Sequence, residues 1–575
     1  MVGSTTPPRD RWPAWLLAAV TILAAYALAL AWSGGFTFRL AGIPIRSHSW
    51  ERPALLAGLG AIVLALTARD KVAAISARAW CVLESARFET ALAVAAMTWT
   101  LGAGIGFGTF ASGGSDSYGY VGQARLFLQG RLTDTVPLRA EYTWPNVEAT
   151  LTPLGFTVGK PAGVIAPKYP PGLPLLLAPL AAFSERAIYL LVPVFGALLV
   201  WITFRLGAAF GDPLAGACAA VLLSASPTFL YQVVRPMSDV PAAACWLGAL
   251  VLALRATSSS AACAGAITSL AILIRPNLAP LAALIAAAAI VSGDRPRTGR
   301  ALAFAAALAP GLVLLGWIQN VRYGSPTGSG YGTVSDAFSW KYLAPNLARY
   351  PRWLTGSHTW FIWLSLAAPA WIVRRASRPL AAWLALGLAA AVWAAYLPYI
   401  YFQPNEWFYT RFLLVAIVVM LLFSAAVALW ILRRLAVSWR TPVVLCVFGG
   451  LLAVLLHISQ VLGAFDIRLQ ERKYPLAGAF VRDRLPATAF VLAAQHSGSI
   501  RYYANRPTLR WDLLSPGRLD EAVATFRAQG YEPFLVVDGG EYDQFKARFD
   551  ATGQRAVQHL VPLAVLGDAR VFAFR

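Results

Sequence analysis

The chain has 575 residues, of which 58% are hydrophobic and only 13% are charged. Soluble proteins carry about twice that charged fraction, so the composition excludes an ordinary soluble enzyme and indicates a membrane protein. The formal net charge is +21. The Lys and Arg residues are spread over short loops and the C-terminal tail, which is typical of membrane topology and argues against nucleic acid as a partner.

Apolar runs near 20 residues recur along the first 465 residues, and a helix needs about 20 residues to cross the bilayer core. We therefore predict that residues 1–465 form an α-helical polytopic membrane domain with about 13 spans. The predicted spans are residues 14–32, 53–68, 90–111, 187–206, 214–231, 240–254, 261–274, 278–292, 301–318, 359–373, 380–397, 412–432 and 442–464.

The basic residues between these spans fall on one side of the predicted membrane. They lie before the first span and in loops at 69–87, 295–300, 374–378 and 433–440. Loops rich in Lys and Arg stay in the cytoplasm. We therefore expect a cytoplasmic N-terminus, with the first large loop (112–186) and the C-terminus outside.

Residues 466–575 have a composition typical of a soluble domain. Short apolar runs predict strands at 490–494, 534–538 and 571–574, with helices at 519–529 and 541–549 between them. We expect a small extracytoplasmic α/β domain of about 110 residues.

Asp116 stands where the chain leaves the third predicted span, in the stretch Gly113-Gly114-Ser115-Asp116-Ser117-Tyr118-Gly119-Tyr120. A carboxylate at this depth is costly unless it is wet or paired. The carboxylate either caps the helix predicted at 117–129 or takes a proton from a substrate hydroxyl. Tyr120 lies four residues on, over the same helix face.

Several cations and aromatic residues are predicted at the same outer depth of the membrane. Each has a simple structural explanation, such as a snorkelling lysine, an Arg–Asp pair four residues apart or an interfacial aromatic belt. As a set they suit a lipid phosphate and its sugar. The candidate binding residues, besides Tyr120, are Lys168, Tyr169, Arg235, Asp239, Arg275, Glu406 and Arg411.

The five histidines are scattered and no two fall at metal-ligand spacing, so we predict no metal site and no certain cofactor. A divalent cation held by oxygen ligands from Asp116 and Asp239 is left open.

The layout resembles the GT-C polytopic glycosyltransferases, whose relatives include protein O-mannosyltransferases and bacterial aminoarabinose transferases. The resemblance covers roughly residues 91–432 and is carried by Asp116 with its neighbours and by the segments Tyr169–Gly172, Pro236–Pro241, Arg275–Asn277 and Trp407–Phe412. It implies a multi-pass enzyme of the bacterial inner (plasma) membrane. It also implies that Asp116 is the catalytic carboxylate.

The implied activity is inverting transfer of a sugar, a hexose or a pentose, from a polyprenyl-phosphate donor to an extracytoplasmic glycan, lipid or protein. Asp116 would be the general base, and Lys168, Arg235 or Arg411 would stabilise the leaving phosphate. The alternatives are a secondary transporter and a non-catalytic membrane protein that binds lipid or glycan. A ligase or polymerase of lipid-linked glycans would share most of the chemistry.

Overall fold

The computed structural model describes residues 12–40, 43–255, 257–292, 297–400 and 406–575. In this part of the chain, seven helices are long and apolar enough to cross a membrane, or eight if the bent pair α9–α10 counts as one span. The predicted fold class, a polytopic helical protein with a small C-terminal sheet, is confirmed. The predicted count of about 13 spans is not confirmed, because several apolar runs form shorter helices that pack inside the bundle.

Five of the candidate spans are single α-helices or nearly so: α1 (Trp12–Ser33), α4 (Ala86–Gly106), α14 (Arg297–Tyr323), α18 (Pro379–Tyr396) and α20 (Val437–Val461). Two more begin with a short 3-10 segment: η1 with α8 (Ala187–Leu190, Leu191–Phe210) and η5 with α19 (Trp407–Leu413, Leu414–Leu432). The bent pair is α9 with α10 (Pro213–Ser224, Pro227–Val233). The other helices of this part are α2 (Glu51–Thr67), α3 (Arg69–Leu83), α7 (Gly172–Phe183), α11 (Asp239–Ala253), α12 (Ser258–Ile274), α13 (Leu281–Val291), α16 (Leu343–His358), η4 (Trp360–Ala367) and α17 (Ala368–Arg375). A strand pair, β1 (Phe36–Leu40) and β2 (Ile43–Ser47), follows α1.

The helix α19 lies at the centre of the bundle. Within Trp407–Leu432, 94% of an 18-residue stretch is buried inside the protein. A helix that is apolar on every face is typical of such a position. Because α19 is fixed on all sides, the residues of η5 at its start are held at a defined place.

Local signals explain where the helices near the site begin and end. Asp212 accepts a hydrogen bond from the Ala215 backbone and Pro213 begins α9, as expected for a helix N-terminus. Ser226 caps α10 in the same way, and the chain bends by 62° between the two helices. At the other end of a helix, Pro276 stops α12 and leaves Arg275 at its C-terminal cap.

The first large loop contains its own elements: α5 (Asp116–Leu128), β3 (Asp134–Thr135), α6 (Val147–Leu151), β4 (Phe156–Val158) and β5 (Val164–Pro167). The three strands form an antiparallel sheet in the order β3-β5-β4. The short helix α7, inside the region predicted as loop, follows at Gly172.

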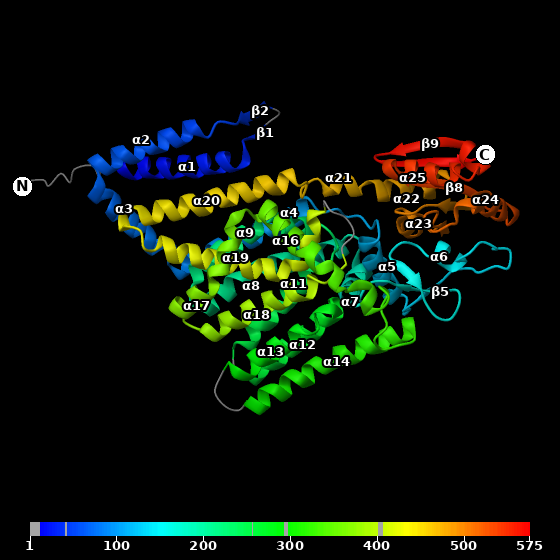
Figure 1. Cartoon of the computed structure of the whole chain (residues 1–575), viewed down its shortest axis with the longest axis horizontal. Coiled ribbons are helices and arrows are strands. Elements are labelled where there is room, and N and C mark those ends of the chain that lie inside the picture. Colours follow the sequence, from blue (N-terminus) through cyan, green and yellow to red (C-terminus); the bar gives the residue numbers. More distant parts are fainter. Residues whose placement is uncertain (1–11, 41–42, 256, 293–296, 401–405) are drawn as a thin grey trace, which may run out of the picture.

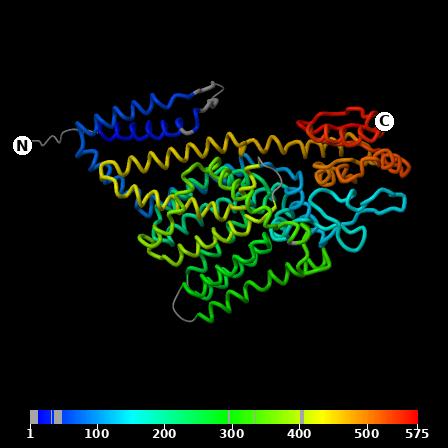
Figure 2. Tube along the Cα trace, in the orientation of Figure 1, coloured from blue at the N-terminus to red at the C-terminus, as the bar shows by residue number. Residues whose placement is uncertain are grey.

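The C-terminal region begins with α21 (Ile467–Glu471) and α22 (Lys473–Arg484), which continue from α20 (Figure 2). It then forms a five-stranded sheet in the order β7-β6-β8-β10-β9, and the predicted strands at 490–494, 534–538 and 571–574 are confirmed. The elements are β6 (Ala489–Leu492), α23 (Ser497–Ala504), β7 (Thr508–Leu509), α24 (Leu519–Ala528), β8 (Glu532–Asp538), α25 (Gly539–Asp550), α26 (Arg555–Gln558), β9 (Leu560–Leu566) and β10 (Ala569–Phe574).

The first large loop and the C-terminal region share one hydrophobic core. This core joins residues from Tyr118 to Ile188 with residues from Phe490 to Phe574. We call residues 112–190 and 466–575 together the head. The head lies at one end of the helical bundle, whereas α3 and α17, which carry predicted cytoplasmic arginines, lie toward the opposite end (Figure 1).

Candidate active site

Asp116 is the first residue of α5, and its carboxylate contacts two residues from other parts of the chain. Tyr169 Oη donates to Asp116 Oδ1 at 2.5 Å, and Arg411 Nη1 donates to Asp116 Oδ2 at 2.9 Å. The cap position of α5 belongs to Ser115. The interpretation of Asp116 as a helix cap is therefore wrong, and 30% of the Asp116 side chain is exposed.

The sequence explains how these three side chains meet. Arg411 belongs to η5 and is held by the central helix α19. Tyr169 follows β5 and packs where Gly119 has no side chain, because a Cβ at Gly119 would lie 2.3 Å from the Tyr169 ring. The Ser115 hydroxyl lies 2.6 Å from Tyr169 Oη, and it donates there because the phenol proton is already given to Asp116.

The surroundings keep Asp116 ionised. Burial raises the pKa of the Asp116 carboxyl, but the Arg411 charge and the hydrogen bonds from Tyr169 and Arg411 outweigh it, so the pKa lies below its ordinary value. Burial and the Asp116 charge raise the pKa of Tyr169 well above its ordinary value. The phenol therefore stays protonated and continues to donate.

A second carboxylate, Asp239, is the first residue of α11 and pairs with Arg275. Arg275 Nη2 donates to Asp239 Oδ1 at 2.5 Å, and the Asp239 side chain is 0% exposed. Arg275 Nη1 also donates to Tyr396 Oη at 3.0 Å. The ends of two helices favour this pair, because a carboxylate suits the N-terminus of α11 and a cation suits the C-terminus of α12.

The two networks are neighbours. Tyr120 Oη donates to Ser238 Oγ at 2.8 Å, and Arg275 Nε donates to the same oxygen at 3.4 Å. On its other side, the Tyr120 ring packs on Tyr169 with ring centroids 4.8 Å apart. Tyr120 therefore joins the Asp116 network to the Arg275 network.

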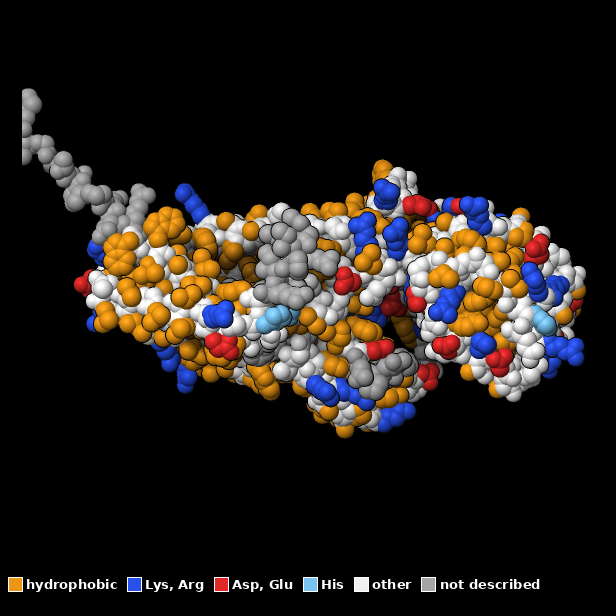
Figure 3. All heavy atoms as spheres, turned by 90° about the horizontal axis from the view of Figure 1, so that it is seen from above, with side chains coloured by type: hydrophobic (Ala, Val, Ile, Leu, Met, Phe, Trp, Pro, Cys, Tyr) orange, Lys and Arg blue, Asp and Glu red, His pale blue; other side chains and the backbone are white. Residues whose placement is uncertain are grey.

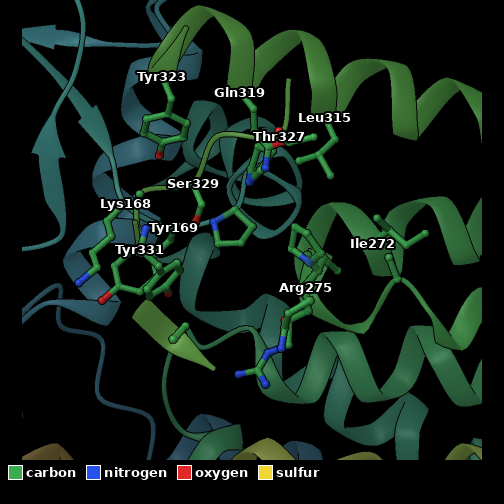
Figure 4. Close-up of a pocket in the computed structure, with 18 of the residues that line it drawn as sticks. Lys168, Tyr169, Ile272, Arg275, Leu315, Gln319, Tyr323, Thr327, Ser329 and Tyr331 are labelled. Carbon is green, nitrogen blue, oxygen red and sulfur yellow. Dashed lines mark hydrogen bonds between the residues drawn. The ribbon is translucent and has the colours of Figure 1, made fainter. Parts of the chain in front are cut away.

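A cavity of about 610 Å³ opens beside these networks. Leu315, Gln319 and Tyr323 reach into it from α14, and Ile272 comes from α12 (Figure 4). Lys168, Tyr169 and Tyr331 are grouped at one end (Figure 4). Arg275 and Tyr120 also line the cavity. The cavity thus combines an apolar side between two helices with three cations, Lys168, Arg275 and Arg322, and several phenols.

Lys168 is the cation at the Tyr169 end of the cavity. Its ammonium lies 5.2 Å from the centre of the Tyr331 ring. Burial lowers the pKa of Lys168, while the charge of Asp116 raises it in part. A half-buried ammonium of this kind gains from an anionic ligand that restores its hydration energy.

Asp116 and Arg411 are absent from the described residues that line this cavity, and Tyr169 stands between Asp116 and the cavity. The space-filling view shows a hollow between the helical part and the head, with acidic and basic side chains at its rim (Figure 3).

Four predicted binding residues lie outside the described cavity lining: Asp239 and Arg411, described above, and Arg235 and Glu406. Arg235 does not pair with Asp239, four residues away; its nearest carboxylate is Glu471 of α21, at 4.0 Å, and its guanidinium stacks over Tyr231. Glu406 precedes η5 and interacts with Tyr409. Roles for Arg235 and Glu406 in substrate binding stay predictions.

The open possibility of a cation between Asp116 and Asp239 does not fit this arrangement. Each carboxylate is paired with an arginine, and the described residues contain no group of three or more His, Cys, Asp or Glu that could hold a metal ion. We derive no step through a metal.

Three polar residues of the hydrogen-bonded networks and the cavity were not predicted as binding residues. Tyr331 lies in a Gly-rich loop, and a Cβ at Gly330 would lie 2.5 Å from the Lys168 backbone, so the loop packs directly on Lys168. The other two are Ser238 and Tyr396. Ser238 belongs to a segment that the resemblance singled out, whereas Tyr396 lies inside an apolar helix without a local signal. Asn277, predicted with Arg275 as a phosphate clamp or a snorkelling pair, donates to Tyr396 Oη at 2.8 Å.

The comparisons with known proteins agree with this architecture. Residues 169–318 match the family described as dolichyl-phosphate-mannose-protein mannosyltransferase. This segment includes Tyr169, Asp239 and Arg275 but neither Asp116 nor Arg411. No match is found among curated proteins.

Solved structures share the fold at low sequence identity. ArnT from Cupriavidus metallidurans bound to undecaprenyl phosphate is 11% identical, with a TM-score of 0.52, over 85% of this chain and 99% of ArnT. The oligosaccharyltransferase of Archaeoglobus fulgidus in the apo form is 12% identical, with a TM-score of 0.50, over 83% of this chain and 73% of that one. At this identity the likeness shows the fold.

Proposed function

Because the chain has the fold of the GT-C glycosyltransferases, we propose that it transfers a sugar from a polyprenyl-phosphate donor to an acceptor on the outer face of a bacterial inner membrane. The observation that carries the proposal is the Asp116 carboxylate, which is held by Arg411 and Tyr169. Tyr169 in turn lines a cavity that presents Lys168 and Arg275. The segment similar to a dolichyl-phosphate-mannose-dependent family supports the same donor class.

The donor occupies the 610 Å³ cavity in this proposal. Its polyprenyl chain lies against the apolar residues of α12 and α14, and its phosphate meets Lys168 and Arg275. A point-charge ammonium and a forked guanidinium both suit a phosphate diester. The phenols of Tyr120, Tyr169 and Tyr331 are placed to contact the sugar.

Asp116 acts as the general base. The acceptor hydroxyl enters from the hollow between the helical part and the head and attacks the anomeric carbon. The new carbon–oxygen bond forms as the bond to the phosphate oxygen breaks. The acceptor proton passes to Asp116 and the electron pair leaves with the polyprenyl phosphate. A carboxylate has about four lone-pair sites, so sites remain for the hydroxyl beside those used by Tyr169 and Arg411.

Attack opposite to the departing phosphate inverts the anomeric configuration. The leaving group is an anion that Lys168 and Arg275 stabilise, so no general acid is needed. Arg411 is reassigned in this mechanism: it holds the base, whereas the sequence suggested that it binds phosphate. Asp239, fully buried, holds Arg275 in place.

The test is replacement of Asp116 in the native host. Asp116→Asn and Asp116→Ala are each expected to abolish one envelope glycan modification, because general base catalysis contributes roughly 100- to 10,000-fold. Membrane levels are measured in parallel. Asp134→Asn, an exposed carboxylate of the same loop, is the matched control and retains the modification. Full modification by Asp116→Asn would refute the proposed mechanism.

A further inference from the structure

The helix α22 packs against the backbone just before Asp116. A Cβ on Gly113 would lie 1.9 Å from Cδ2 of the Tyr474 ring, so the ring occupies the space where any other residue would place its side chain. Gly113 has no Cβ, and this absence is what allows the approach. The loop that leads into α5 thus rests directly on Tyr474.

Tyr474 is itself held in the C-terminal sheet by a charged network. Its ring packs on the His496 ring, with centroids 4.8 Å apart. The buried His496 Nε2 lies 2.8 Å from Asp538 Oδ1 at the end of β8, and Lys473 Nζ donates to Asp538 Oδ2 at 2.5 Å. Lys473, next to Tyr474, and His496, on which the Tyr474 ring packs, therefore both contact the Asp538 carboxylate. This shared contact fixes α22 on the sheet.

The C-terminal region holds the loop on both sides of Asp116. Before it, the Ser112 backbone N–H donates to Tyr503 Oη at 2.7 Å. After it, the Tyr118 ring fills the space at Gly498, where a Cβ would lie 2.1 Å from the ring. Residues 112, 113 and 118 all contact the C-terminal region, while Asp116 between them contacts the membrane part through Arg411.

We propose that Tyr474 is a positioning residue for Asp116. The ring fixes the position of the Gly113 backbone. It thereby fixes the position at which the Asp116 carboxylate meets Arg411 and Tyr169. The C-terminal region is then part of the catalytic unit, in addition to any role in binding an acceptor. The inference rests on the proposed function of Asp116 as the base.

Four variants and one control test it in the full-length protein. Gly113→Ala forces the ring and the loop apart, Tyr474→Ala empties the space, and Gly113→Ala/Tyr474→Ala combines the two. Tyr474→Phe keeps the ring. Gly540→Ala in α25 is the control, because nothing lies within 4 Å of a Cβ at that position.

Purified variants are added to membranes from a host strain that lacks the gene, which supply the native donor and acceptor, and transfer is followed by mass spectrometry. Misplacement of a catalytic group by about 1 Å costs on the order of 100-fold. We expect a loss of roughly 10- to 100-fold in turnover for Gly113→Ala, with unchanged affinity for undecaprenyl phosphate. Tyr474→Phe and Gly540→Ala retain the rate.

The double variant separates positioning from general damage. If the clash causes the loss, removal of the ring makes the added methyl group harmless, so Gly113→Ala/Tyr474→Ala has the rate of Tyr474→Ala alone. Independent effects would instead multiply. A double variant slower than both single variants overturns the proposal.

The pH profile is the second measure. A displaced Asp116 loses contact with Arg411 and Tyr169, so the acid limb of the rate profile moves to higher pH in Gly113→Ala and Tyr474→Ala. A variant that is only less stable keeps the acid limb of its rate profile at the wild-type pH. Several charged and titratable groups surround Asp116 and are left unchanged in these variants. They are Tyr120, Lys168, Tyr169, Arg235, Tyr331, Tyr399, Tyr409, Arg411 and Glu471.

The two proposals fail in different ways. If Asp116→Asn keeps transfer, the proposed function of Asp116 is wrong whatever the Tyr474 variants do. If Asp116→Asn abolishes transfer while Gly113→Ala and Tyr474→Ala keep the wild-type rate and pH profile, only the positioning role is wrong.

Discussion

Arg411 and Asp116 are 295 positions apart in the sequence, yet Arg411 Nη1 donates to Asp116 Oδ2 at 2.9 Å. The contact joins the start of the most buried span to the first residue of α5 in the first large loop. A carboxylate that leaves the membrane at this depth is thereby paired, and part of its surface stays open for chemistry.

Removal of Arg411 tests this pairing. Arg411→Gln leaves Asp116 without its cation, so the pKa of the carboxyl rises toward the value that burial imposes. The base is then protonated over more of the pH range, and transfer falls by roughly 10-fold for each unit by which the pKa exceeds the pH of the assay. Arg411→Lys keeps a charge and retains more activity.

Transfer rates in membranes and the level of inserted protein check the Arg411 prediction. Arg434→Gln, a cation at the other end of α19 that stacks on Trp430, is the control. Equal transfer by Arg411→Gln and wild type would show that the ion pair does not serve the base.

Tyr169→Phe removes the hydrogen bond to Asp116 Oδ1 but keeps the ring. Because Asp116 has a pKa below its ordinary value, the wild-type rate persists above that pKa and is lost only as pH falls through it. Loss of the phenol donor raises the pKa, so the acid limb moves to higher pH. A bond to a charged group contributes about 1.5–3 kcal/mol, which predicts a loss of about 10-fold or more in turnover at pH values on the acid limb.

The control for the Tyr169 prediction is Tyr323→Phe. Tyr323 lines the same cavity and donates to the Pro167 carbonyl at 2.6 Å, away from Asp116. Its acid limb is expected to match the wild type. Identical pH profiles for Tyr169→Phe and Tyr323→Phe would contradict the assignment.

Apolar periodicity predicts most of the helices, and the helices that it predicts incorrectly have a physical explanation. Every predicted span corresponds to one or two helices, because burial in lipid or in protein selects the same residues. Hydropathy alone does not distinguish a full span from a shorter apolar helix. The sequence therefore predicts spans at α2, α11, α12, α13 and the pair η4–α17, which are not among the helices long and apolar enough to cross a membrane. The helix α7 was missed because prolines precede and interrupt it.

The site was predictable in its residue types but not in its pairings. Asp116, Lys168, Tyr169 and Arg275 were identified from their place near the membrane surface. The pairing of Arg411 with Asp116 was not predicted, because a contact across 295 positions depends on how the helices pack. The contact of Gly113 with Tyr474 likewise arises only when the C-terminal region folds back on the loop.

Lys168 is expected to contribute to the affinity for the lipid phosphate. Lys168→Gln removes the ammonium at one end of the cavity, and a charge-assisted contact of about 1.5–3 kcal/mol predicts at least about 10-fold weaker binding of undecaprenyl phosphate. The salt dependence of binding should also weaken. Binding to the purified protein in nanodiscs measures both, with Lys341→Gln, an exposed lysine outside the described cavity lining, as the control.

Asp239 is expected to matter for stability through Arg275. The carboxylate is 0% exposed and its partner 12% exposed, so Asp239→Ala leaves a nearly buried guanidinium without its counter-charge. Removal of one partner of a buried pair costs about 3–5 kcal/mol. Arg275→Gln/Asp239→Asn, which removes both charges, should recover part of this loss.

The exposed pair Arg131–Asp134 is the control, and Asp134→Ala should change stability by about 1 kcal/mol or less. Thermal unfolding in one detergent measures all three variants, and an Asp239→Ala protein as stable as Asp134→Ala would show that Arg275 does not depend on this carboxylate.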